Sequence, residues 1–190
     1  MGRWEPNARP RLVRAALDLF TEQGYDNTTV AQIAERAGLT KTTFFRHFPD
    51  KREVLFAGQD THSRLLADGI ATAPDSATPL EAVAVALDAA TVTFTSDQRE
   101  FGPRLRAVIA GNRELQERDT FKRAGLASAM TEALQKRGVP DPTASLAAEL
   151  GVLAFHRAFA RWVEPTNQQK FTDLARQALH ELRAATATLD

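Results

Sequence analysis

Residues 28–48 read TTVAQIAERAGLTKTTFFRHF, and this stretch decides the fold expected for the amino-terminal part of the chain. Thr29 and Gln32 lie three residues apart just ahead of apolar positions, which is the capping box that starts a helix. Gly38 ends this helix after about eight residues, because glycine readily adopts the left-handed conformation that closes a helix. A second helix follows at once, with Thr40 as its N-cap. Two short helices joined by about three residues have the spacing of a helix-turn-helix.

The second helix, over residues 40–48, is expected to divide its side chains between two faces. Phe44 and Phe48 lie one turn apart and share a face, so with Leu39 they fill the space between the first three helices. Hydroxyl and basic groups gather on the opposite face, from which they can reach base edges or phosphates in a major groove. The outward residues are Lys41, Thr42, Phe45 and Arg46, flanked by Thr43 and His47.

The charge of the chain is balanced overall but uneven locally. Lys plus Arg (24) equals Asp plus Glu (24), so the protein as a whole is not a general nucleic-acid binder. Residues 36–52 nevertheless hold five basic residues against one acidic residue, a local charge of +4, and residues 1–14 hold four arginines against one glutamate. This asymmetry favours a local basic surface around the helix-turn-helix.

Helical periodicity extends through the rest of the chain, and no segment shows the alternation of a strand. The fold class is therefore all-α, with three short helices followed by a larger helical body. We expect one domain over residues 1–50, which holds the helix-turn-helix, and a larger helical domain over residues 51–190, to which the family resemblance described below assigns effector binding and dimerisation. The expected helices, about nine in number, cover approximately residues 7–23, 29–37, 40–48, 50–72, 80–95, 103–110, 113–137, 143–163 and 168–186.

Lys51 falls in the first turn of the helix expected over residues 50–72. A cation is unfavourable there because the helix dipole places partial positive charge at the N-terminus. The same position becomes favourable if a phosphate binds, since a helix N-terminus with an added lysine attracts anions. Thr28 and Thr29, at the start of the helix over residues 29–37, are phosphate candidates for the same reason.

Several classes of function are excluded or disfavoured. The chain has no cysteine, so disulfides, cysteine metal sites and thiol nucleophiles are excluded. No signal peptide and no apolar run of about 18 residues is found, which predicts a soluble, cytoplasmic protein. Asp60 and His62 do not share a helix face, and no catalytic triad, phosphate loop or paired carboxylates are seen. We therefore expect no metal, no cofactor and no enzymatic activity.

Residues 11–58 resemble the DNA-binding domain of the tetracycline-repressor-like (TetR) family of transcriptional regulators. The motifs that carry the resemblance are AALDLF, GYDNTTV, IAERAGLTKTTFFRHF and DK, at the family's spacing. The resemblance implies a two-fold homodimer on a palindromic operator in double-stranded DNA, with the helix over 40–48 in the major groove. By position it implies phosphate contacts from Thr28, Thr29, Thr40, His47 and Lys51, and base contacts from Lys41, Thr42 and Thr43.

Two residues depart from the family pattern. The family often has tyrosine at the position of Phe45, and the tyrosine hydroxyl reaches a phosphate. Phe45 cannot donate that bond, although its ring can pack on a thymine methyl group or on a sugar. The family often has glycine at the position of Thr42, which can instead read a base through its methyl or hydroxyl group. Both departures bear on the operator sequence and not on the mode of binding.

The carboxy-terminal body has the family's length and helical character but no motif of its own. The resemblance implies a small effector inside it and a four-helix dimer bundle made by the helices over 143–163 and 168–186. Candidates to line an apolar effector cavity, each of which also fits a plain core position, are Phe94, Phe101, Leu105, Ile109, Phe121 and His156. Candidates for the dimer interface are Leu150, Leu153, Phe159, Trp162, Leu174 and Leu182.

Two other functions remain open at this point. The first alternative is a helical adaptor for protein interactions, which keeps the fold but has lost DNA binding. The second is a small-molecule carrier or enzyme that uses the carboxy-terminal cavity without DNA. The adaptor hypothesis gains if the basic residues Arg36, Lys41, Arg46 and Lys51 scatter over different faces.

Overall fold

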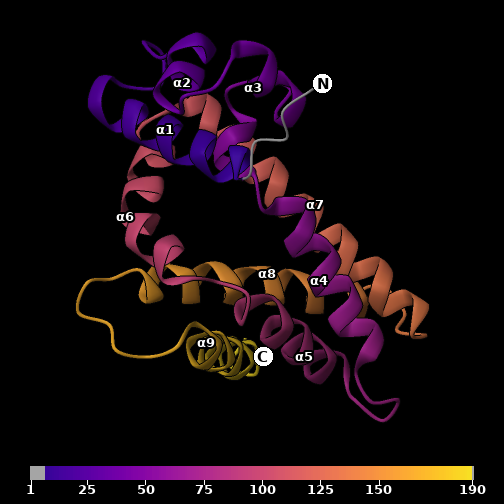
Figure 1. The fold of residues 1–190 in the computed structure, drawn as a ribbon. Helices are drawn as coiled ribbons and strands as arrows, with labels where there is room; N and C mark the ends of the chain where they lie inside the picture. The colour runs from indigo at the N-terminus through magenta and orange to yellow at the C-terminus, as the bar shows by residue number, and fades with distance from the viewer. Residues whose placement is uncertain (1–6, 190) are drawn as a thin grey trace. The chain divides into compact units, whose positions relative to one another are not determined.

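The computed structural model describes residues 7–189, in which the regular secondary structure is all helical and no strand is present (Figure 1). This confirms the all-α prediction. Arg3 and Glu5, which belong to the charged amino-terminal segment, lie outside the described residues. The α-helices are α1 (Ala8–Gln23), α2 (Val30–Arg36), α3 (Lys41–His47), α4 (Gln59–Thr72), α5 (Pro79–Thr91), α6 (Ser96–Ala110), α7 (Arg113–Lys136), α8 (Thr143–Trp162) and α9 (Phe171–Thr186), with a 3₁₀ helix η1 (Glu53–Phe56) before α4.

Contacts divide the chain into two compact units. Of the described residues, unit 1 holds 7–58 and 104–119, and unit 2 holds 59–103 and 120–189. The division falls within α6 and α7. The functional division at residue 50 stays a prediction, because compactness alone does not say which residues serve DNA and which serve an effector.

The amino-terminal helices of unit 1 begin and end where local chemistry places them. The hydroxyl of Thr29 accepts the N–H of Gln32 at 3.3 Å, and Gln32 Oε1 accepts the N–H of Thr29 at 2.8 Å. This confirms the capping box of α2. Thr40 caps α3 by accepting the N–H of Thr43 at 3.1 Å. The two short helices therefore have defined starts that satisfy exposed backbone donors.

The prediction of one helix over residues 50–72 is wrong at its start. Asp50 does cap this segment, because its Oδ1 accepts the N–H groups of Arg52 at 2.8 Å and Glu53 at 3.1 Å. The segment it caps is the 3₁₀ helix η1, and α4 begins only at Gln59. After Glu53, η1 contains three consecutive buried residues, Val54, Leu55 and Phe56. This continuous burial departs from the single buried stripe of an amphipathic α-helix.

The sequence suggested that Pro103 starts a helix. In the structure Pro103 lies inside α6, which begins at Ser96. The helix begins at another capping box, in which Thr95 Oγ1 accepts the N–H of Gln98 at 3.3 Å and Gln98 Oε1 accepts the N–H of Thr95 at 2.9 Å. The signal was present in the sequence as Thr-x-x-Gln. Proline was the more conspicuous marker, but Pro103 lies in the interior of α6, where it cannot donate a backbone hydrogen bond.

The core of unit 2 is made by α4, α5, α8, α9 and the part of α7 from Thr120 onward, and it is rich in alanine. Small side chains let the helices approach closely. At Gly69 of α4 an added Cβ would lie 2.5 Å from the Cα of Ala86 in α5. Two ion pairs with two hydrogen bonds each also hold the unit, Arg161 to Glu181 and Arg176 to Asp88. None of the helices described over residues 7–189 is long and apolar enough to cross a membrane.

The close crossing of α4 and α5 gives a test of the fold. Gly69→Ala should lower the free energy of unfolding by about 1–3 kcal/mol, because the new methyl group collides with backbone and not with a flexible side chain. Gly125→Ala is the matched control, since a Cβ at Gly125 within α7 meets nothing within 4 Å. That variant should be stabilised by about 0.5–1 kcal/mol. Urea denaturation of both variants measures the difference, and equal effects would contradict the crossing.

Candidate nucleic-acid interface

The turn between α2 and α3 is set by Gly38, whose φ is 65°. This is the left-handed conformation predicted from the sequence, and it confirms the helix-turn-helix geometry. The Arg11 side chain of α1 donates to the carbonyl of Ala37 and, at 3.4 Å, to that of Gly38. A Cβ at Gly38 would lie 2.8 Å from Arg11 Nη2. The backbone therefore favours glycine here, and any larger residue would also have to displace the Arg11 guanidinium group.

The two phenylalanines in the middle of α3 have opposite environments. Phe44 is fully buried and Phe48 is 2% exposed, whereas Phe45 is 49% exposed. The Phe44 and Phe48 rings lie 5.6 Å apart, and the Phe45 ring stands edge-on to Phe44 at 5.6 Å. This confirms the predicted division of α3 into a core face and an outward face.

The outward face of α3 carries hydroxyl, basic and aromatic groups together. Lys41 Nζ lies 5.9 Å from the centroid of the Phe45 ring. The hydroxyls of Thr40 and Thr43 are 2.9 Å apart at the start of the helix. Thr43 is half-buried, and the remaining predicted residues of this face are exposed: Thr40, Lys41, Thr42, Phe45, Arg46 and His47.

The basic patch is narrower than the sequence suggested. Arg36 turns to α1, where its two Nη atoms donate to the carboxylate of Glu22 at 2.9 and 2.7 Å. The hydrogen bond from Arg36 lowers the pKa of Glu22. Arg52 pairs likewise with Asp50 at 2.7 Å and with Glu114 at 3.3 Å. These exposed pairs add little stability, but they leave Lys41 and Arg46 as the cations of the α3 surface.

Lys51 is half-buried and bonded within unit 1. Its Nζ donates to the carbonyls of Tyr25 at 2.8 Å and Thr28 at 3.1 Å, and it lies 4.0 Å from the centroid of the Tyr25 ring. Lys51 therefore ties the loop before α2 to the segment before η1. An ammonium group has three N–H donors, and these two bonds leave one of them for a phosphate. The predicted phosphate contact stays a prediction.

The two threonines before α2 are placed differently. Thr28 is 1% exposed, and its hydroxyl donates to the carbonyl of Gly24 at 2.8 Å while accepting from Gln23 at 3.2 Å. Its side chain is therefore used inside the loop and is not presented on the surface. Thr29 is exposed at the start of α2. Of this pair, Thr29 is the one whose hydroxyl lies where a phosphate can approach.

Tyr25, the only tyrosine of the chain, joins three parts of unit 1 and was not singled out by the sequence. Its ring lies 5.1 Å from that of Phe20 in α1, under the ammonium group of Lys51. Its hydroxyl donates to Glu114 Oε1 at 3.3 Å. Burial, and then the negative charge of Glu114, raise the pKa of Tyr25. A buried ring with a polar end suits this position between an apolar core and a carboxylate.

The six predicted effector residues are divided between the two units, and their role stays a prediction. Leu105 and Ile109 belong to unit 1, and the other four belong to unit 2. Phe94 is half-buried in a cluster of rings, stacked on His62 at 4.7 Å and edge-on to Phe171 at 4.9 Å. The remaining two aromatic candidates differ, since Phe101 is half-buried and Phe121 is 65% exposed.

His156 is the effector candidate with an unusual environment. Its Nε2 atom is buried without a hydrogen-bond partner in the structure. Burial, assisted by the positive charge of Arg123, lowers the pKa of His156 to about 3. The imidazole is therefore neutral at physiological pH. Phe155 lies between it and Phe94, with ring centroids 5.7 Å from His156 and 5.8 Å from Phe94.

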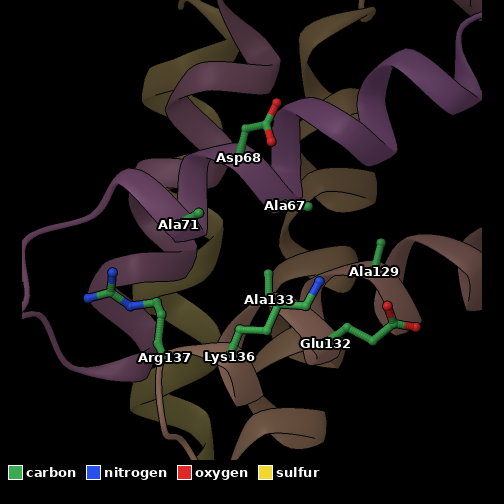
Figure 2. A pocket seen from close by; sticks show the side chains of 8 residues that line it. All are labelled: Ala67, Asp68, Ala71, Ala129, Glu132, Ala133, Lys136 and Arg137. Atoms are coloured by element: carbon green, nitrogen blue, oxygen red, sulfur yellow. The ribbon is translucent and has the colours of Figure 1, made fainter.

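The hollow found in unit 2 lies between α4 and α7 (Figure 2). Alanines form much of its lining, with charged side chains around them (Figure 2). None of the predicted effector residues lines it. The lining residues are Ala67, Asp68, Ala71, Ala129, Glu132, Ala133, Lys136 and Arg137.

The predicted dimer residues also separate by burial. Trp162, Leu174 and Leu182 are buried in the core of unit 2, at 7%, 2% and 6% exposure. Leu150 and Phe159 are half-buried, and Leu153 is 42% exposed. Over residues 7–189, no group of three His, Asp or Glu side chains is arranged to hold a metal ion.

Comparison with known proteins finds relatives of the amino-terminal region. Residues 12–57 match the family model for bacterial regulatory proteins, tetR family. The HTH-type transcriptional regulator TcmR of Streptomyces glaucescens is 40% identical over 81 residues, 43% of this chain and 36% of that protein. Tetracycline repressor protein class A from transposon 1721 of Escherichia coli is 37% identical over 75 residues, 36% of this chain and 33% of that protein. The chain thus spans about a third of the length of these curated relatives.

Solved structures match over nearly the whole chain at low identity. A TetR-family protein from Syntrophomonas wolfei has a TM-score of 0.61 at 17% identity, with 97% of each chain covered. The fatty acid degradation regulator FadR of Bacillus halodurans has a TM-score of 0.54 at 20% identity, covering 95% of this chain and 96% of that one. At these identities the likeness is one of fold.

Gly38 provides a test of the turn. Gly38→Ala should destabilise the protein by more than about 1–2 kcal/mol, the cost of the left-handed conformation alone, because the methyl group also displaces Arg11. Gly138→Ala is the matched control, since Gly138 has φ 84° and nothing within 4 Å of an added Cβ. Thermal unfolding of both variants separates conformational strain from crowding. Equal losses would show that Arg11 yields without cost.

The raised pKa of Tyr25 predicts a loss of folding stability at alkaline pH. Its pKa is raised in the folded state, so the folded protein holds the phenol proton more tightly than the unfolded chain does. The stability that the folded protein gains from holding this proton is fully present below about pH 10, the pKa of an unfolded tyrosine. It is lost as the pH rises toward the pKa of Tyr25 in the folded protein. Urea midpoints measured on either side of about pH 10 should fall more steeply for the native protein than for Tyr25→Phe. Parallel curves would contradict the prediction.

Proposed function

We propose that this chain, a member of the tetR family of bacterial regulatory proteins by its amino-terminal domain, is a homodimeric transcriptional regulator that responds to a small-molecule effector. In this proposal α3 enters the major groove of a palindromic operator in double-stranded DNA. The observation that supports it most directly is the outward face of α3, where Lys41, Arg46 and exposed Phe45 stand on a helix held by the Gly38 turn. A positioned helix with such a face is the reading element of a helix-turn-helix.

The residues of this surface take two kinds of role. We assign base contacts to Lys41, Thr42 and Thr43, near the start of α3, because the N-terminal residues of a recognition helix reach base edges. We assign phosphate contacts to residues around that face, which fix the position of the protein but do not read sequence. These are Thr29, Thr40, His47 and Lys51, while Thr28 is left to support the loop from inside.

A second copy of the chain is the partner that we propose for α8. Leu146 and Leu153 are 57% and 42% exposed and lie seven residues apart, with half-buried Leu150 between them, so they share a face. These leucines extend the predicted set outward, whereas Trp162 and the α9 leucines stabilise the protomer itself. Two-fold pairing of α8 and α9 would cover this apolar stripe and would match the symmetry of a palindrome.

The effector is proposed to be a largely apolar molecule bound in unit 2. The support is the ring cluster around Phe94 and the neighbouring His156, whose neutral imidazole has an unpaired nitrogen. Phe101 and Phe121 remain candidates in the same unit. One relative carries the name tetracycline repressor, and a repressor is the role we propose here. A regulator of bacterial genes works where the DNA is, in the cytoplasm, and needs no cofactor or catalytic activity.

One observation favours the adaptor alternative. Arg36 and Lys51, two of the four basic residues counted for the DNA surface, are turned to Glu22 and to the carbonyls of the loop before α2. An adaptor would use the same fold without DNA. Operator binding decides between the two functions, since an adaptor shows none.

The test compares two cations near the helix-turn-helix. DNA is selected from random duplexes and from the region upstream of the gene, and affinity is measured by fluorescence anisotropy. Lys41→Ala should weaken binding by about 1–3 kcal/mol and relax the preference at one base pair. Arg36→Ala removes the same charge but should have a small effect, because Arg36 is paired with Glu22. Failure of the native protein to select any DNA would refute the proposed function.

A further inference from the structure

We propose that Phe45 determines operator specificity by packing on the 5-methyl group of a thymine in each half-site. The inference rests on the proposed function, because it assigns one base contact within the DNA-binding face of α3. It goes further by naming the chemical group that the ring reads.

The exposure of Phe45 has no explanation within the fold. Among the residues of unit 1 that the structure describes, Phe45 is the only large apolar side chain that is exposed. The core face of α3 is already filled by Phe44 and Phe48. A polar residue would be more favourable at a position that meets only water, so the ring is best explained by a contact that forms on binding.

The ring is held in place before any partner arrives. It stands at 83° to the ring of Phe44, with centroids 5.6 Å apart, and Phe44 is itself fully buried. Lys41 Nζ lies 5.9 Å from its centroid. A side chain supported by a buried neighbour loses little rotamer freedom on binding, so a small apolar contact contributes nearly its full value.

The chemistry of the ring selects the group that it reads. Phe45 has no donor or acceptor, so it cannot bond to phosphate oxygens or to the polar atoms of base edges. In the major groove the apolar group on a base edge is the thymine methyl. Packing on it removes apolar surface from water on both sides, whereas packing on a sugar would carry no sequence information.

Lys41 places a second base close to this thymine. A lysine on a recognition helix pairs with the O6 and N7 acceptors of guanine. Base pairs are stacked about 3.4 Å apart, so an ammonium group 5.9 Å from the ring centroid reaches a base within about two steps of the thymine. The structure therefore points to a guanine and a thymine within two base-pair steps of one another in each half-site.

The experiment removes only the methyl group. Operators selected from random duplexes are resynthesised with each thymine replaced in turn by deoxyuridine, symmetrically in both half-sites, and affinities are measured for the full-length protein. At one thymine position the native protein should lose about fourfold in affinity for each half-site, the value of one buried methyl group.

Two variants assign the effect to a residue. Phe45→Ala should bind the thymine and deoxyuridine operators equally, because the partner of the methyl group is gone. Lys41→Ala should bind both more weakly but keep the difference between them. Circular dichroism and thermal unfolding check that each variant is folded, and folding should be retained since Phe45 is half exposed and Lys41 is exposed.

The possible results distinguish failure of the thymine contact from failure of the proposed regulatory function. Discrimination by the native protein that is lost in Phe45→Ala supports the inference. Tight operator binding with no cost for deoxyuridine at any position overturns it and leaves the regulator intact. A cost that persists unchanged in Phe45→Ala also overturns it, because another residue then reads the methyl group. Selection of no DNA at all overturns both.

Discussion

The left-handed backbone at Gly38 is the constraint on which the arrangement of α2 and α3 depends. It turns the chain within a few residues, so that Phe44 and Phe48 enter the core that α1 and α2 begin. Burial of those two rings fixes the rotation of α3 about its axis. Once that rotation is fixed, Lys41, Thr42, Phe45 and Arg46 have no freedom to face anywhere but outward.

Cations near this turn serve two purposes that composition does not distinguish. Arg11 binds the carbonyls at the end of α2, where the helix dipole favours positive charge, and Lys51 binds the carbonyls of the loop before α2. These bonds help to hold α3 in position. Lys41 and Arg46 remain on its surface. A net local charge of +4 therefore overstates the charge that DNA would meet, although the framework that positions the remaining cations is itself partly built from cations.

Where the sequence could be interpreted correctly, the deciding interactions were local. The capping boxes at Thr29 and the cap at Thr40 join residues three apart, and the spacing of Phe44 and Phe48 is one helical turn. Errors arose where a local signal competed with packing. The segment after Asp50 forms a 3₁₀ helix in which Val54 to Phe56 are all buried, and Pro103 lies within α6, which begins at the Thr95 cap.

The sequence by itself determined that the chain is helical, where the helix-turn-helix lies and which of two adjacent phenylalanines faces outward, because each depends on contacts within a few residues. Tertiary structure alone decided the rest. It paired Arg36 with Glu22, 14 residues away, and brought Tyr25 to Glu114, 89 residues away. It also assigned Leu105 and Phe94 to different units. Such outcomes depend on which helices pack together, and helical periodicity defines the apolar face of a helix without naming its neighbour.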